Sequence, residues 1–294
     1  MTSLPPEIRD FYNRPTAMTA LGAHVAALDG LDPDVAGLCE VIQGVLLHFH
    51  WAKAYGVDLS PERGDQQHLR SASATLDAIL AIDERSLTTR REAKDRAVGV
   101  CRHYAVVTSA MLRAQGVPAR SRCGFGAYFM PGEFVDHWVV EYWDEAGGRW
   151  RLVDSQIDAL QTAALKPDFD PLDTPRDRFL IAGDAWLQCR ASALDPARFG
   201  IMDMRGLWFV GGNVLRDFAA LNNMEMLPWD CWGPAPQSDQ ALTPETLALF
   251  DRLAMLTLDA DNHFAEIRDL YETDPALSVP AEVFNAVRNR IEAV

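Results

Sequence analysis

Three side chains near the middle of the chain have the types and spacing of a nucleophilic acyl-transfer site. Cys101 follows Gly99 at the point where a helical pattern begins. His137 lies 36 residues further along, and Asp154 follows after another 17, each at the edge of a strand-like run. A thiol can attack a carbonyl carbon, an imidazole can move the proton, and a carboxylate can orient the imidazole. The order Cys, His, Asp therefore predicts cysteine-based acyl transfer.

The predicted place of Cys101, in the first turn of a helix, suits a nucleophile. A free thiol has a pKa near ~8.5 and is mostly protonated at neutral pH. Unpaired N–H groups, the positive end of the helix dipole and a nearby imidazolium all favour the thiolate. We expect Gly99 to allow a tight backbone turn into this helix. The backbone N–H of Cys101 would form an oxyanion hole with one further donor.

A hairpin is expected to bring His137 and Asp154 together. Residues 138–143 and 150–153 are strand-like and flank a turn-rich segment. If these strands pair across the turn, residues whose numbers sum to about 293 face each other. His137 and Asp154 sum to 291, so they would lie opposite or one diagonal apart, which suits a carboxylate that accepts the imidazole N–H. A one-residue slip of register would separate them.

The surrounding pattern predicts an α+β fold, in which a helix packs on an antiparallel sheet and helical extensions flank this core at both termini. Helical apolar spacing from Val35 through Phe49 predicts a helix that Gly56 ends. The other elements predicted before the hairpin are a helix over 66–82, a charged connection or short helix over 83–96, a helix over 101–115, and a strand over 119–129 that carries Gly124 and Gly126. Those predicted after it are helices near 184–192 and 212–222, a strand near 207–210, a loop over 227–236, and helices from Pro244, His263 and Ala281. We expect residues 1–175 to form the core with its N-terminal helices. Residues 176–294 would be a mainly helical extension, packed on the core as one globular unit.

Composition and charge narrow the classes of partner. The formal net charge of −15 argues against nonspecific binding to nucleic acid or to an anionic membrane. It is compatible with a cationic or amine-bearing substrate, and solubility explains it equally well. The first seven residues have neither a basic segment nor an apolar run, so no secretory signal is expected, and no apolar stretch is long enough for a membrane span. The five scattered cysteines contain no Cys-x-x-Cys pair, which favours a reducing cytoplasm over a disulfide scaffold or a zinc ribbon.

The segment from Asp95 to Gln156 resembles the transglutaminase-like superfamily of cysteine enzymes. Residues 99–102 and 112–120 match its pattern of a catalytic cysteine that opens a helix, which ends in a Gly-aliphatic-Pro-Ala-Arg turn. Residues 137–139 and 150–154 match its histidine strand and aspartate strand in order and type. The resemblance implies a papain-like core in which Cys101 is the acyl-accepting nucleophile, His137 the general base and acid, and Asp154 the residue that orients His137.

The chain also departs from the family pattern. Ser155 stands where relatives often have proline, and no acidic loop typical of a calcium site occurs. Calcium-dependent protein cross-linking is therefore not expected, and neither a metal nor a cofactor is predicted.

Several further side chains have a functional and a structural interpretation. Relatives often recruit an upstream side chain as the second oxyanion donor, and Trp51, Gln43 or Gln67 could supply it; ordinary helix packing is the alternative. Tyr104 could line the cleft or fill the core, and Asp136 could replace Asp154 only if it faced the imidazole. His48 and His50 are two residues apart, and on a helix this spacing argues against a metal pair. His103 would pack in the core or face solvent. Arg120 and Arg122 would share a solvated face or bind a substrate carboxylate.

The resulting hypothesis is a cysteine-dependent acyl-transfer enzyme that acts on a peptide, amide or acyl-thioester substrate. The Cys101 thiolate would form a thioacyl intermediate, which water hydrolyses or an amine captures. A protease or amidase is the first interpretation, and an amide-bond-forming acyltransferase of a small-molecule pathway is the second. A binding protein that keeps the fold without the chemistry is the third, and the oligomeric state is left open.

Overall fold

The structure is a computed structural model that describes residues 3–28, 30–31 and 34–294. Met1 and Thr2, which begin the segment predicted to lack a secretory signal, lie outside the described residues. The chain forms two compact units: the first comprises residues 1–121 and 139–174, and the second comprises residues 122–138 and 175–294. Both strands that cross the division, β3 (Ala119–Gly126) and β4 (Phe134–Asp144), contribute residues to each unit.

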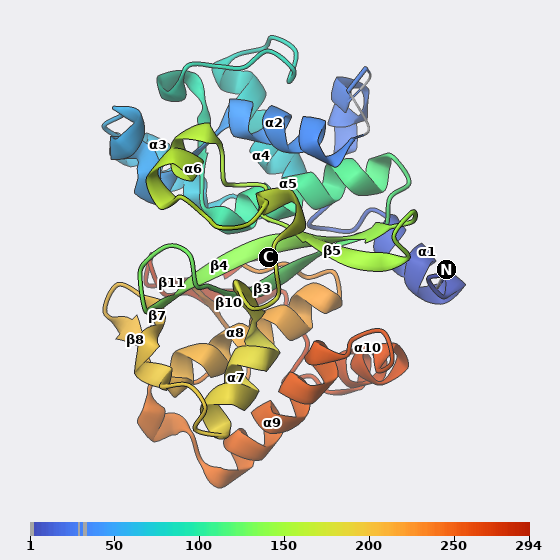
Figure 1. The fold of residues 1–294 in the computed structure, drawn as a ribbon, viewed down its shortest axis with the longest axis vertical. Coiled ribbons are helices and arrows are strands. Elements are labelled where there is room, and N and C mark those ends of the chain that lie inside the picture. The colour runs from blue at the N-terminus through green and yellow to red at the C-terminus, as the bar shows by residue number, and fades with distance from the viewer. Residues whose placement is uncertain (1–2, 29, 32–33) are drawn as a thin grey trace. The chain divides into compact units, whose positions relative to one another are not determined.

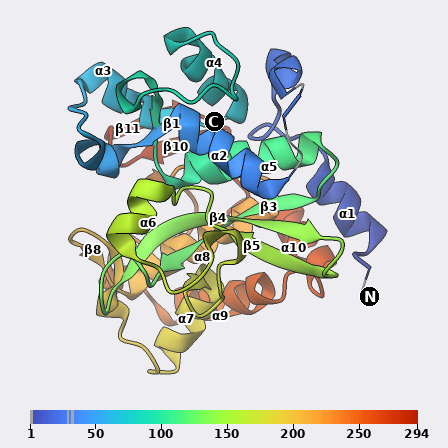
Figure 2. The ribbon, with the colours of Figure 1, turned by 45° about the horizontal axis from the view of Figure 1, so that its top comes forward.

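The first unit is built around helix α5 (Cys101–Ala114), against which helices α2 (Val35–Val45), α4 (Ala72–Ile82) and α1 (Pro6–Asn13) pack. Figure 2 shows α2 and α5 side by side. The other elements of this unit are β1 (Leu46–His48), β2 (Ala97–Gly99), β5 (Arg149–Val153), the short helices α3 (Pro61–Gly64) and α6 (Ala159–Leu165), and the 3₁₀ helices η1 (Gly22–Leu28), η2 (Phe49–Tyr55), η3 (Asp65–His68), η4 (Ala93–Asp95) and η5 (Pro171–Asp173).

In the second unit, helices α7 (Ala182–Arg190), α8 (Leu207–Leu221) and α9 (Pro244–Leu258) pack against one another, and α10 (Phe264–Thr273) packs on α8 and α9 (Figure 1). The remaining elements of this unit are β6 (Phe179–Ile181), β7 (Phe199–Ile201), β8 (Met204–Arg205), β9 (Asp230–Cys231), β10 (Glu282–Asn285), β11 (Arg290–Ala293), η6 (Pro196–Arg198) and η7 (Asp239–Ala241).

The largest sheet has the strand order β6-β3-β4-β7-β8, with β5 also paired to β4. The β3–β6, β4–β5 and β7–β8 pairs are antiparallel, whereas β4 and β7 are parallel. Helices and mostly antiparallel strands together confirm the predicted α+β class. The helix predicted over 101–115 and the hairpin formed by β4 and β5 are confirmed as well.

Several predicted elements are wrong. The helix predicted over 66–82 is broken into η3 and α4, because the side chain of Ser71 caps a new helix start, and the loop predicted over 227–236 contains β9. The helix from Val35 does not run through Phe49, because Leu46–His48 leaves it to form β1, which pairs in parallel with β2. Residues 207–210, predicted as a strand, form the first turn of α8. The segment from Ala281, predicted as a helix, is the hairpin β10–β11, in which Val283 and Asn285 are buried and Glu282 and Phe284 are exposed, a period of two.

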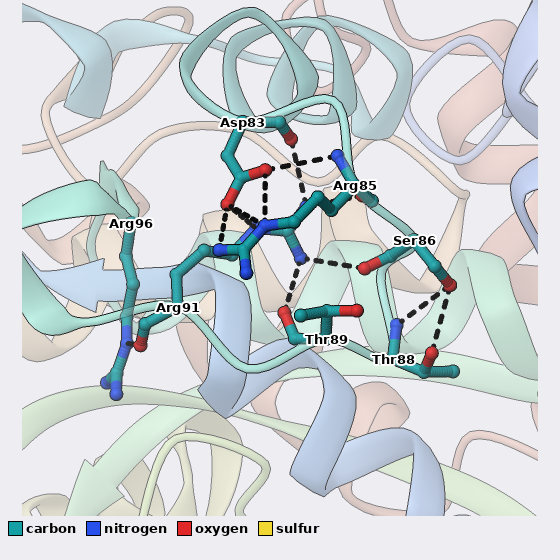
Figure 3. Close-up of polar contacts among 7 residues, drawn as sticks. All are labelled: Asp83, Arg85, Ser86, Thr88, Thr89, Arg91 and Arg96. Carbon is teal, nitrogen blue, oxygen red and sulfur yellow. Dashed lines mark hydrogen bonds and ion pairs between the residues drawn. The ribbon is translucent and has the colours of Figure 1, made fainter.

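The charged connection over 83–96 is organised around the buried guanidinium of Arg91. Figure 3 shows this side chain among backbone carbonyl groups of the preceding turn. Its Nη1 donates to the carbonyls of Ser86 and Thr89 at 3.2 and 3.0 Å, and its Nη2 donates to those of Asp83 and Arg85 at 3.0 and 2.8 Å. The Asp83 carboxylate lies 3.6 Å from Arg91 Nε and also pairs with exposed Arg85, which lowers the pKa of Asp83 to about 2. The part of this connection that precedes η4 has no regular structure and is thus folded around one cation.

Candidate functional site

Cys101 is the first residue of α5, as predicted, and the residue is 7% exposed. Strand β2 leads into it and is held on both sides: Leu47 and Val98 are partners in the parallel β1–β2 pair, and Val98 N donates to Gln66 Oε1 at 2.8 Å. The thiol therefore lies in the first turn of a long helix, where unpaired backbone N–H groups and the helix dipole favour negative charge.

The reason for glycine at position 99 differs from the predicted one. Gly99 is not among the residues with a positive φ; instead, a Cβ at this position would lie 2.9 Å from both Cβ and Cγ of His103. His103 is buried, and its Nδ1 accepts the N–H of Val100 at 3.1 Å, which satisfies a donor at the start of α5. Burial, with the charge of Arg102 nearby, lowers the pKa of His103 to about 3. His103 is thus a neutral residue that caps the helix and packs in the core.

Asp154 is buried directly after β5 and belongs to the same unit as Cys101. Its Oδ1 accepts the N–H of Gln156 at 3.1 Å, and its own N–H donates to the Pro171 carbonyl at 2.8 Å. The thiol of Cys39 in α2 is buried, and this burial raises its pKa; the negative charge of Asp154 raises it further. The carboxylate is therefore held by its own loop, in the neighbourhood of α2.

The side chain of Gln43 fixes the loop that follows Asp154. Its amide nitrogen donates to the carbonyls of Ser155 and Ile157 at 3.2 and 3.1 Å. Further along, Gln156 Nε2 donates to Gln161 Oε1 at 2.9 Å. This amide support was missed by sequence reasoning, although the two glutamines so soon after a buried aspartate were a usable signal.

His137 is buried in the part of β4 that belongs to the second unit. Its ring lies among aromatic neighbours of that unit, the nearest being Phe129 at 4.7 Å between ring centroids. The adjacent Asp136 does not share this environment: its Oδ1 accepts a hydrogen bond from Asn213 Nδ2 of α8 at 2.7 Å, and burial raises its pKa. Asp136 is thereby engaged by α8.

The register of β4 and β5 agrees with the prediction. Val140 pairs with Val153, and the partners continue to Asp144 and Arg149, so the residue numbers of each pair sum to 293. The ladder ends at Val153, one residue before Asp154.

The other candidate residues have varied surroundings. Tyr104 is buried in α5, which raises the pKa of its hydroxyl, and its ring centroid is 6.2 Å from that of His48. His48 Nδ1 accepts the N–H of His50 at 3.3 Å and so caps η2. Trp51 and Gln67 are half-buried in η2 and η3.

Arg120 and Arg122 do not lie on a solvated face. Arg120 Nε donates to Glu141 at 2.6 Å, and its guanidinium lies 4.0 Å from the ring centroid of Trp150. Arg122 forms two hydrogen bonds to Asp217, at 3.0 and 2.7 Å. Both pairs are almost fully buried, so these arginines are structural and the predicted solvated face or carboxylate-binding role is wrong.

All five cysteines are free thiols, and burial raises the pKa of Cys189 to about 12. Over residues 3–28, 30–31 and 34–294, no cluster of three or more His, Cys, Asp and Glu side chains could hold a metal ion. Within the same ranges, none of the helices combines the length and the apolar character that crossing a membrane requires.

Comparison with known proteins identifies the central segment. Residues 81–155 match the model of the transglutaminase-like superfamily. This segment, about a quarter of the chain, is transglutaminase-like. It contains Cys101, His137 and Asp154, and it starts 14 residues before Asp95, where the sequence resemblance described above begins.

Two individual relatives were found. Over 122 residues the chain is 32% identical to the protein-glutamine gamma-glutamyltransferase of Pseudomonas aeruginosa, an alignment that covers 36% of this chain and 18% of that protein. The chain thus spans less than a fifth of the length of this relative. A solved structure of a candidate cysteine protease from Cytophaga hutchinsonii matches with 19% identity and a TM-score of 0.35, over 52% of this chain and 43% of that chain, and we draw nothing from a likeness at this level.

Proposed function

We propose that this protein is a cysteine-dependent acyl-transfer enzyme in which Cys101, His137 and Asp154 form the catalytic triad. The observation that supports this most is the register of the β4–β5 hairpin. If this ladder is continued by one residue, Asp154 pairs with Val139. His137 lies two residues before Val139 in β4, so the two side chains are on the same side of the strand. Partners in an antiparallel ladder share a face, so the histidine and the aspartate are assigned to one face of the sheet, one diagonal apart.

The proposed reaction begins at the Cys101 sulfur. The thiolate attacks the carbonyl carbon of an amide or thioester, and the oxyanion that forms accepts the backbone N–H of Cys101. The imidazolium of His137 gives its proton to the leaving amine or thiol, and a thioacyl enzyme remains. Asp154 accepts the other imidazole N–H and fixes the tautomer of His137.

The second oxyanion donor is assigned to Trp51 or Gln67 rather than Gln43. The amide nitrogen of Gln43 already donates to two backbone carbonyls, and this supports a role for Gln43 in holding the Asp154 loop. The substrate class is a peptide, amide or acyl thioester. The five free thiols support a reducing compartment such as the cytoplasm.

Alkylation of the thiol with iodoacetamide tests the triad without a known substrate. We expect Cys101 to react well below pH 8, and we expect His137→Ala to shift this reactivity to the range of a free thiol, because the imidazolium no longer stabilises the thiolate. Peptide mass spectrometry assigns the label to Cys101, and the buried Cys39 and Cys189, whose thiol pKa values are raised, are internal controls. Reactivity of Cys101 equal to that of free cysteine in the native protein would overturn the proposal.

Hydrolysis and transfer to an amine share the thioacyl intermediate. Hydrolysis is our first assignment. Transfer to an amine is supported by the name of the Pseudomonas aeruginosa relative, a gamma-glutamyltransferase. Intact-mass trapping with a pool of peptides, amides and acyl thioesters, followed by addition of a labelled alkylamine at low concentration, separates the two: a transferase yields the amide of that amine, and a strict hydrolase yields the free acid. Cys101→Ala is the blank, and no adduct on the native enzyme would argue for a binding protein.

A further inference from the structure

The imidazole of His137 lies among three aromatic rings of the second unit. The ring centroid of Phe129 is 4.7 Å away, with an interplanar angle of 65°, and those of Tyr128 and Phe179 are 6.1 and 6.2 Å away. Phe179 is fully buried in β6, whereas Tyr128 and Phe129 are half-buried in the loop that follows β3. All three form T-shaped pairs with the imidazole, a favoured geometry of aromatic pairs.

Gly126 of β3 makes room for the aromatic rings of the loop that follows. A Cβ at this position would lie 2.7 Å from Cε2 of Phe129 and 3.0 Å from Cζ of Tyr128. Gly126 does not have a positive φ, so the requirement is for space and not for an unusual backbone. Gly124 is required by the sheet itself, because a Cβ there would overlap the Leu180 carbonyl oxygen of the paired strand β6.

The loop that carries Phe129 is anchored at both ends within the second unit. At its start, Ala127 N donates to the Arg178 carbonyl at 2.8 Å. At its end, Arg198 donates to the Gly132 carbonyl, and Glu133 forms an ion pair with Arg205. These anchors fix the two ends of the loop that carries Phe129.

We propose that Phe129, seated over Gly126, is a positioning residue that fixes the imidazole plane of His137. The inference rests on the proposed function, in which this imidazole must offer one nitrogen to a thiol and the other to a carboxylate. An edge-on ring in contact restricts rotation of the imidazole about its Cβ–Cγ bond, and it keeps water from that side of the ring. Small losses of alignment in a catalytic group lower the rate of the step it serves.

The test compares variants that remove, displace or keep the ring. Phe129→Leu removes the ring and keeps an apolar side chain, Gly126→Ala displaces the ring, and Phe129→Tyr keeps it. Met130→Ala changes an exposed side chain of the same loop and is the matched control. Far-UV circular dichroism and the melting temperature verify that each variant is folded.

Two readouts are measured for each variant: the alkylation rate of Cys101 as a function of pH, and the imidazole signals of His137 in two-bond proton–nitrogen NMR spectra. We expect Phe129→Leu and Gly126→Ala to lower the alkylation rate at pH 7 by about twofold to tenfold, the range of one aromatic pair. The midpoint of the pH profile moves up toward the free-thiol value of ~8.5, and the His137 signals shift. Phe129→Tyr and Met130→Ala behave like the native protein.

The outcomes separate this inference from the proposed function. If His137→Ala suppresses alkylation while Phe129→Leu leaves the rate, the midpoint and the imidazole signals unchanged, the positioning role is wrong and the triad stands. If His137→Ala has no effect on alkylation, the triad is wrong, and unchanged imidazole signals in Phe129→Leu would then exclude the positioning role independently.

Discussion

At the residue scale, Gly99 and His103 depend on each other at the entrance to α5. The missing side chain of Gly99 leaves space for the His103 ring, and the ring accepts the N–H of Val100. This bond requires an unprotonated Nδ1, so the neutral imidazole is part of the folded state. Protonation would place a charge in the core and remove the acceptor.

The first prediction concerns acid stability. The folded-state pKa of His103, about 3, lies below the ~6.5 of an unperturbed histidine. Between these values the unfolded chain binds more protons than the native one, so the free energy of unfolding falls as the pH falls from about 6.5 to about 3. We expect His103→Gln, whose amide oxygen can accept the same N–H, to show a weaker loss of stability between pH 7 and pH 4.5. Urea unfolding at several pH values measures this, and an unchanged pH slope would contradict it; the partly exposed His263, replaced in the same way, is the control.

Individual roles were harder to predict than residue types. Cys101, Asp154 and His137 were singled out by type and spacing. Cys101 begins α5 and Asp154 follows β5, as predicted, whereas His137, expected at the edge of a strand, lies inside β4 because that strand starts at Phe134. Arg120 and Arg122 were assigned to a solvated face because their partners, Glu141 and Asp217, lie 21 and 95 residues away in the sequence. Pairing over such distances leaves no periodic trace in a single sequence.

At the scale of elements, the hairpin was predictable and the short apolar runs were not. The β4–β5 register followed from two strand-like runs around one turn. Residues 207–210 are too short an apolar run for periodicity to distinguish a strand from a helix turn. Leu46 continues the helical spacing of α2 but pairs with Ala97, and this long-range partner overrides the local pattern.

The second prediction concerns the loop around Arg91. Arg91→Met removes four hydrogen bonds to backbone carbonyls, and we expect a loss of about 2 kcal/mol or more in the free energy of unfolding. Amide hydrogen exchange over residues 83–91 should become faster. Arg91→Lys should recover only part of the loss, because an ammonium group cannot reproduce the planar fork of a guanidinium.

Arg85→Met is the matched control for this loop. Arg85 is more than half exposed and pairs with the same Asp83, so its loss should cost less than about 1 kcal/mol. Equal effects of the two substitutions would contradict the view that Arg91 organises the loop.

At the scale of the whole molecule, Arg120 and Arg122 lie two residues apart in β3 and form buried ion pairs that stabilise different units. Arg120 and Glu141 belong to the first unit, with Tyr12 and Trp150 around the guanidinium. Arg122 belongs to the second unit and, besides Asp217, donates to the Thr257 carbonyl of α9 at 2.8 Å. Removal of one partner of a buried pair leaves an uncompensated charge.

The third prediction uses this division. We expect Arg120→Met and Arg122→Met each to lower the free energy of unfolding by about 3 to 5 kcal/mol. Arg122→Met should raise amide exchange in α8 and α9, and Arg120→Met should raise it in α1 and β5, because local opening follows the unit that lost its pair. Hydrogen-exchange mass spectrometry measures both patterns. Faster exchange in the same helices for both variants would show that the units do not open separately.

The parallel β1–β2 pair has a consequence for how the protein folds. Leu46 and Ala97 are neighbours in space although they are 51 positions apart in the sequence. The entropy of closing so long a loop must be overcome before this pairing contributes any stability, so it forms later than the local turns of α5. Because β2 leads directly into α5, we expect the Cys101 thiol to remain open to oxidants and alkylating reagents through the slow phase of refolding. A newly synthesised chain would therefore need a reducing environment for this thiol before it needs a substrate.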